Sequence, residues 1–192
     1  MSWLTQHITL HSHDSAPEEW ANGITHLIGA VLAVIGTVLL VLKHDEMHLQ
    51  AAFALFGLTM ILLFSASTAY HLSPNGSQWK RFFRLMDHLS IFLLIAGTYT
   101  PIMTVIGTSW AYRTLAMVWI LAATGITLKV VFWDSFRRSQ VLFFLAMGWL
   151  AIIRIRDIVA ILPMPISADF SRNCCMNSIP EWGRVSRPSR KA

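Results

Sequence analysis

Long apolar runs separated by short polar links dominate the chain from Asn22 to Trp133. A membrane-spanning helix needs about 20 mostly apolar residues, because a helix rises about 1.5 Å per residue and the hydrocarbon core is about 30 Å thick. Four segments meet this requirement and predict spans over about 22–42, 49–70, 87–106 and 110–133. We therefore expect an all-α protein, a polytopic bundle of transmembrane helices.

A fifth apolar segment is too short to span a membrane by its apolar residues alone. Val141–Ile153 is uninterrupted, but Arg154, Arg156 and Asp157 follow it directly. The segment reaches span length only by continuing through these charges, over about 139–162. Each charge costs about 2.5–3.5 kcal/mol at the centre of a membrane and less near its edge. The fifth span is therefore marginal.

Tryptophans lie at the predicted ends of the spans. Trp20, Trp79, Trp110 and Trp133 all occupy such boundaries, and tryptophan is enriched where a membrane meets water. This placement favours interfacial side chains over tryptophans packed in a core. Lys129, near the end of the fourth span, is likewise expected to extend its amine to the interface.

Positive charges are distributed unequally among the links. The second link carries Lys80, Arg81 and Arg84, and the fourth carries Lys129, Arg137 and Arg138. The first link carries only Lys43, and the third only Arg113. Cytoplasmic loops are enriched in Lys and Arg. The pattern predicts a multi-pass protein of the bacterial inner membrane whose N-terminus is cytoplasmic.

Composition agrees with a membrane protein. Hydrophobic residues make up 55% of the chain and charged residues 13%, whereas about a quarter of the residues of a soluble domain are charged. The net charge of +5 lies mostly in residues 163–192, which hold five Lys or Arg and two Asp or Glu. We therefore do not expect nucleic acid as a partner. Residues 1–21 are expected to form a cytoplasmic tail, and residues 163–192 a basic, disordered tail.

Four polar residues are expected at one membrane face. Ser67 and His71 lie four apart at the end of the second span and so share a helix face. His26 is near the start of the first span and Asp87 near the start of the third. Ionisable groups at membrane depth are functional candidates, and His and Asp are zinc ligands or their partners. Spacing alone slightly favours the simpler interpretation, in which these groups are hydrated at headgroup level.

Several motifs resemble the hemolysin III family, the bacterial branch of the progestin and adiponectin receptor superfamily. They are Ser67–His71 (STAYH), Asp87–His88, Leu94–Pro101 (LIAGTYTP) and Leu145–Leu150 (LAMGWL), preceded by Glu18–Glu19, Asn22, His26 and Gly29. The resemblance covers about residues 17–153. It implies a seven-helix bundle, of which 22–153 would form four or five helices, with a cytoplasmic N-terminus.

The resemblance also implies a zinc site. In the superfamily, a histidine of the second span and two of the seventh hold zinc, with a serine and an aspartate nearby. His71 matches the first ligand, Ser67 the serine and Asp87 the aspartate, and His26 is a candidate substitute ligand. The two seventh-span histidines have no counterpart, so we expect zinc to bind weakly or not at all.

The resemblance is expected to stop at Ile153. Two explanations of the following residues remain open. One is a genuine shorter variant with an added basic segment, and the other is a truncated or frameshifted reading of a longer gene. The abrupt change in composition and the five positive charges on the outer side of a fifth span favour the second.

Three kinds of function follow from the resemblance. The first is a membrane-homeostasis or cytolytic (hemolysin) role with a residual metal-site constellation. The second is a zinc-dependent lipid amide hydrolase, in which Asp87 or Ser67 would assist proton transfer. The third is a pore-former in target membranes, although the spans are typical of resident helices and not of a secreted toxin. An inactive truncated product is a further alternative. Membrane lipids are the expected partners, and further copies of the chain would cover helix faces left open by absent helices.

Overall fold

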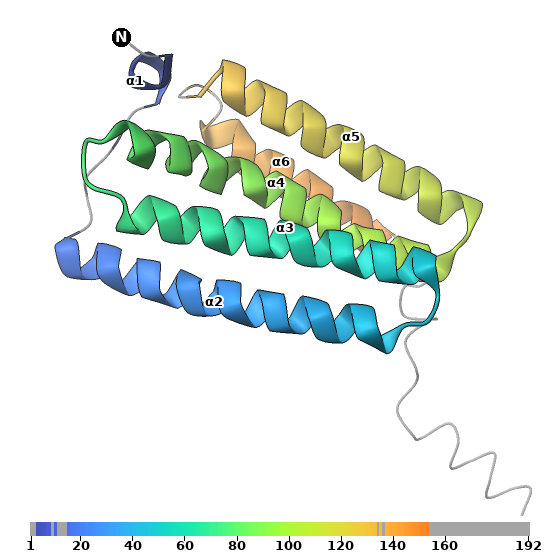
Figure 1. Cartoon of the computed structure of the whole chain (residues 1–192). Coiled ribbons are helices and arrows are strands. Elements are labelled where there is room, and N and C mark those ends of the chain that lie inside the picture. The colour runs from blue at the N-terminus through green and yellow to red at the C-terminus, as the bar shows by residue number, and fades with distance from the viewer. Residues whose placement is uncertain (1–2, 9, 11–14, 134, 136, 154–192) are drawn as a thin grey trace, which may run out of the picture. The chain divides into compact units, whose positions relative to one another are not determined.

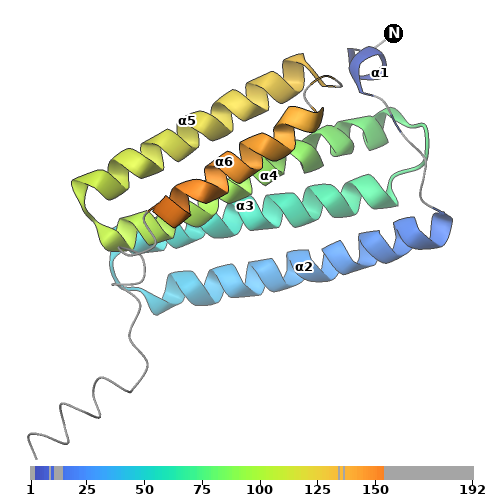
Figure 2. The same ribbon diagram turned by 180° about the vertical axis from the view of Figure 1, so that it is seen from behind.

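The computed structural model describes residues 3–8, 10, 15–133, 135 and 137–153, and every regular element among them is an α-helix. Figures 1 and 2 show the helices from opposite sides. Their bounds are α1 Trp3–His7, α2 Ala16–Lys43, α3 Met47–Leu72, α4 Gln78–Ile106, α5 Ser109–Val131 and α6 Arg137–Ile153. Within this part of the chain, α2 to α5 are long and apolar enough to cross a membrane. The expected all-α, multi-pass membrane protein is confirmed.

The start of α4 differs from its expected position. The helix begins at Gln78, well before the start of the span expected at residue 87. The Ser77 hydroxyl accepts a hydrogen bond from the Lys80 backbone N–H at 3.0 Å and so caps the first turn. The charged residues before Asp87 are therefore helical rather than part of a loop. The link to α3 is short, and it brings the end of α3 next to the start of α4 (Figure 1).

From α2 onward, helices adjacent in the sequence pack side by side, and α6 lies against α5 and α4 (Figure 2). The short α1 instead contacts α4. Close approach depends on glycine at the centre of the bundle. A Cβ on Gly97 of α4 would overlap the Thr59 hydroxyl of α3. On the other side of α4, a Cβ on Gly125 of α5 would overlap the Phe92 ring. Glycine at both positions therefore lets α4 sit between its two neighbours.

Pro101 lies inside α4 without ending the helix. It cannot donate a hydrogen bond to the Gly97 carbonyl, four residues earlier. The Thr98 and Thr100 hydroxyls donate to the carbonyls of Ile95 and Ala96, at 2.7 and 3.1 Å. These bonds add side-chain donors next to the interrupted position, although neither reaches the Gly97 carbonyl itself.

The marginal fifth segment is a helix through Ile153. It is held by α4, because the Tyr99 hydroxyl donates a 2.6 Å hydrogen bond to the backbone carbonyl of the fully buried Met147. The rest of the expected span, 154–162, and the tail 163–192 lie outside the described residues.

Part of the N-terminal tail and two side chains expected at the membrane interface, Trp133 and Lys129, are buried in the structure. Ile8, after α1, is buried with Leu85 of α4 and with Trp133. Trp133 is only 5% exposed, whereas Trp20 is 63% exposed, so the interfacial interpretation is wrong for Trp133. Lys129 does not extend to the interface either: it is buried, and its Nζ donates to the Trp133 carbonyl at 3.1 Å. The N-terminal segment thus packs against apolar side chains of α4 and against Trp133.

Candidate functional site

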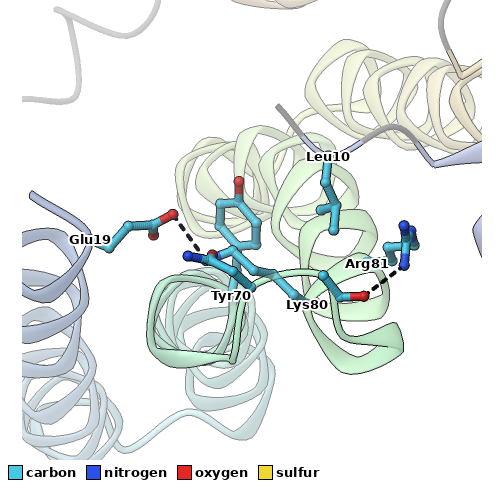
Figure 3. Close-up of a pocket in the computed structure, with 7 residues that line it drawn as sticks. Leu10, Glu19, Tyr70, Lys80 and Arg81 are labelled. Carbon is cyan, nitrogen blue, oxygen red and sulfur yellow. Dashed lines mark hydrogen bonds and ion pairs between the residues drawn. The ribbon is translucent and has the colours of Figure 1, made fainter. Parts of the chain in front are cut away.

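A three-residue network joins α2, α3 and α4 at one end of the bundle. The Glu19 carboxylate accepts at Oε1 from Lys80 Nζ at 2.9 Å, and its Oε2 lies 2.8 Å from His71 Nδ1. The side chains of Lys80, His71 and Glu19 are 6%, 13% and 14% exposed. Charged groups withdrawn from water to this degree are stable only when paired. The close-up in Figure 3 shows the Glu19–Lys80 pair.

Local structure places each member of the network. Glu19 is on the first turns of α2, where the Ser15 backbone N–H donates to Glu18 at 2.6 Å in a capping box. His71 is on the last turn of α3 and Lys80 on the first turn of α4. Lys80 Nζ also donates to the Ser73 carbonyl at 3.4 Å and so ties the α3–α4 link to the network.

His26 and Ser67 lie beside this network. His26 is seven residues after Glu19, which is two helical turns, so both face α3. Its ring is parallel to that of His71, with the ring centroids 5.8 Å apart. Ser67 is buried at 4% exposure, one turn before His71. The structure thus brings together His26, His71 and Ser67, three of the four residues expected at one membrane face.

The fourth residue, Asp87, belongs to a second polar cluster between α4 and α5. Its carboxylate lies 3.9 Å from His88 Nδ1. The His88 ring packs against Trp133 with centroids 5.1 Å apart, and Lys129 Nζ lies 3.9 Å above the Trp133 ring. Asp87 therefore lies beside His88, whereas His71 pairs with Glu19.

The described residues fit zinc only in part. Among them, no group of three or more His, Cys, Asp or Glu could hold a metal ion. His71 already has Glu19 on its Nδ1, the arrangement by which a carboxylate orients a metal-binding histidine. The two imidazoles of His71 and His26 fall short of the three protein ligands of a catalytic zinc site. The described residues therefore do not form a complete zinc site.

Sequence reasoning missed the roles of Glu19 and Lys80. In the sequence, Glu19 was noticed only as part of a family motif, and Lys80 was counted only among the positive charges of a link between spans. The seven-residue spacing of Glu19 and His26 was a usable signal, because it places both on one face of α2. Nothing local pairs Glu19 with Lys80, which are 61 positions apart.

Comparison with known proteins finds related chains in bacteria and in animals. The chain is 37% identical over 145 residues to Hemolysin-3 of Bacillus cereus, covering 73% of this chain and 66% of that protein. It is 36% identical over 149 residues to a Hemolysin-3 homolog of Bacillus subtilis (strain 168), covering 76% of this chain and 70% of that protein. It is 25% identical over 142 residues to the monocyte to macrophage differentiation factor of Homo sapiens, covering 69% of this chain and 58% of that protein. The aligned region thus spans about two thirds of the two bacterial relatives.

The family comparison covers most of the chain. Residues 15–176 match the model of the family described as haemolysin-III related. The match continues past Ile153, so the expectation that the resemblance stops there is wrong. Together with the four membrane-spanning helices, this match shows that the chain belongs to the haemolysin-III-related family of multi-pass membrane proteins.

Proposed function

We propose that this chain resides in the bacterial inner membrane and maintains the physical state of that membrane, using the Glu19–His71–Lys80 network at the cytoplasmic face. The observation that carries the proposal is the network itself. Three nearly buried ionisable groups tie three spans together at the end of the bundle that holds Lys80, Arg81 and Arg84. Ionisable groups retained at the edge of a membrane are costly and mark functional positions.

The surroundings of the network favour an action on the membrane. The neighbouring side chain of Trp20 is 63% exposed, and that of Trp79 at the start of α4 is 67% exposed. Tryptophans at helix ends lie at the level of lipid headgroups. The network is thus expected at the depth where headgroups, water and hydrocarbon meet, and changes in lipid packing would act on the helices it joins.

Ser67 and His26 support a second candidate, hydrolysis of a lipid amide. The buried Ser67 hydroxyl, the His26 imidazole and the carboxylate-bound His71 lie near one another at the expected membrane edge. The zinc that such a hydrolase uses to activate water would be held by His71 and His26, which supply two of the three protein ligands that it needs. The family is related to the progestin and adiponectin receptor superfamily, which is consistent with this candidate. A cytolytic role is suggested by the names of the bacterial relatives alone.

The test measures membrane order in a bacterial host that expresses the full chain. A fluorescent probe of lipid packing is read before and after a drop in temperature. We expect wild type to change the response, and Glu19→Gln to abolish the change because it removes the charge that Lys80 and His71 share. The matched control is Glu46→Gln. Glu46 also pairs with a histidine, His48 at 3.3 Å, but it is 66% exposed and at the other end of α3.

Parallel assays separate the candidates. If membrane order is unchanged while the purified chain lyses erythrocytes, the cytolytic role replaces the proposal. If purified chain releases fatty acid from a ceramide and Ser67→Ala stops the release, the hydrolase candidate replaces it. An equal effect of Glu19→Gln and Glu46→Gln would remove the network from the proposal.

A further inference from the structure

A cavity opens beside the network and contains a cationic group that the network does not use. Its volume is about 240 Å³, and it is bounded by α2, α3, the α3–α4 link, α4 and the N-terminal segment. In Figure 3 the Tyr70 ring and Leu10 lie between the Glu19–Lys80 pair on one side and Arg81 on the other. The seven lining residues are Leu10, Glu19, Tyr70, Asn75, Gly76, Lys80 and Arg81.

The charges around the cavity favour an anion. Both oxygens of Glu19 are occupied, one by Lys80 and the other by His71. With Glu19 and Lys80 neutralising one another, Arg81 leaves the cavity with an excess positive charge. Arg81 Nη1 donates to the Gly76 carbonyl at 3.0 Å, and its Nε is buried with no hydrogen-bond partner among the described residues. A guanidinium held by one edge can direct its remaining donors to the oxygens of a phosphate.

The first turns of α4 also provide an apolar surface for an acyl chain. A hollow of about 510 Å³ is lined by Leu4, Gln78, Trp79 and Phe82, and the last two side chains are 67% and 37% exposed. Trp79 and Phe82 are three residues apart, so they share one helix face. One short stretch of α4 therefore presents cationic groups to a polar cavity and aromatic groups to hydrocarbon, at the headgroup depth marked by the exposed tryptophans.

We infer that this cavity binds the phosphate of an anionic phospholipid headgroup, with Arg81 as the main charged contact and Asn75 and the α3–α4 link at its rim. A soluble phosphate ester offers the same anionic chemistry, but the neighbouring apolar hollow and the exposed tryptophans favour the lipid. The inference deepens the proposed function by naming a ligand class beside its network. It requires only that the helices cross a membrane.

The test uses the full chain purified in detergent and incubated with equal amounts of phosphatidylglycerol and phosphatidylcholine. Native mass spectrometry then gives the ratio of the two lipids retained per chain. We expect wild type to retain phosphatidylglycerol preferentially, and Arg81→Gln to lower the ratio about tenfold, the effect of losing one charge-assisted contact. The matched control is Arg113→Gln on α5, because Arg113 also donates to a backbone carbonyl, that of Ser109 at 3.3 Å.

A second variant covers the case in which Arg81→Gln fails to fold. Asn75→Asp places a negative charge on an exposed residue of the link, where no buried structure is lost. Its control is Thr108→Asp, at an exposed position that caps α5, where Asp is also a good N-cap. We expect Asn75→Asp to lower the retained ratio and Thr108→Asp to leave it unchanged.

Three results would overturn the inference. One is retention of the two lipids in equal amounts by wild type, and another is an equal fall in the ratio for the cavity variants and their controls. The third is complete displacement of the lipid by glycerol phosphate or inorganic phosphate at the same concentration, which would assign the cavity to a soluble ligand. The retained lipid is measured by mass spectrometry on the purified chain, whereas the proposed function is tested by a membrane-order probe in cells. Failure of this inference and failure of the proposed function are therefore distinguishable.

Discussion

Lys80 carries its charge at a position where only 4% of the residue is exposed, and its Nζ lies 5.1 Å from the Tyr70 ring centroid as well as beside Glu19. Taking such a charge out of water costs several kcal/mol, which a close partner offsets. The residue is therefore stable there only because Glu19, from a helix distant in sequence, occupies the other side of the contact.

The first prediction follows from that dependence. Lys80→Met leaves Glu19 nearly buried without its closest cation, and we expect it to lower the free energy of unfolding by about 3–5 kcal/mol. Thermal unfolding of the detergent-solubilised chain measures the change. Lys43→Met, the same substitution at an exposed position at the end of α2, should have little effect.

The double variant Glu19→Gln with Lys80→Met gives a sharper comparison. It removes both charges, so it should be more stable than Lys80→Met alone. If the double variant is instead less stable by the sum of the two single losses, the two residues do not act as a pair.

The second prediction concerns metal. We expect elemental analysis of the purified full chain to find well under one zinc per chain, because the described residues supply only His71 and His26 as nearby imidazoles. One zinc per chain that is lost in His71→Ala and kept in His48→Ala would show that further ligands exist. His48 is a suitable control because it is exposed.

At the scale of single residues, helical spacing found Ser67 and His71 on one face of α3, and the expected span ends placed His26 at the same depth. The His26 and His71 rings do stack across α2 and α3, but the partners of these residues were not found. The contact of Glu19 with Lys80 depends on how three helices are packed, which no local pattern contains. Trp133 was misjudged for a similar reason, because the N-terminal segment that packs against it is distant in sequence.

Helix contacts rather than helix propensity fix the arrangement of the elements. Gly97 and Thr59 bring α4 and α3 together, and the Thr59 hydroxyl donates to the Phe56 carbonyl at 2.7 Å. A side chain bonded in this way cannot move aside without losing its hydrogen bond. Gly36 in α2 has no neighbouring atom within 4 Å of a Cβ placed on it.

The third prediction compares these two glycines. Gly97→Ala should destabilise the chain by about 1–3 kcal/mol, since the added methyl group overpacks the α3–α4 contact. Gly36→Ala should be neutral or stabilise it by up to about 1 kcal/mol, because alanine favours a helix and nothing opposes the methyl group. Unfolding temperatures of the two variants in detergent measure both. Equal effects would show that the α3–α4 contact is not tightly packed.

The elements themselves were largely accessible from the sequence. Spans over 22–42, 49–70 and 110–133 correspond to α2, α3 and α5, because an apolar run of span length has few other structures available. The start of α4 was missed, since hydropathy marks where a helix enters hydrocarbon and not where it begins. The Ser77 cap was the relevant signal.

For the whole molecule, alternation of the spans fixes which ends lie on the same side. The fourth prediction is that reporter fusions placed after Asn75 and after Gln140 both read cytoplasmic, because Lys and Arg are concentrated at the helix ends near these two positions. A fusion after Thr108 serves as the control and should read periplasmic. A periplasmic signal after Asn75 or Gln140 would reverse the proposed orientation of the bundle.

The hydrogen bond from Tyr99 to the Met147 carbonyl has a consequence for how the protein tolerates change. The hydroxyl binds the main chain of α6, which every amino acid supplies, and not the side chain at that position. Random substitution along this stretch of α6 would leave the bond intact as long as the helix persists, whereas Tyr99→Phe removes it at once. The bond therefore constrains the side chain at position 99 and not the side chains of α6. In a saturation mutagenesis screen, position 99 should be far less permissive than Gly148, an exposed residue whose carbonyl also lies 3.3 Å from the hydroxyl.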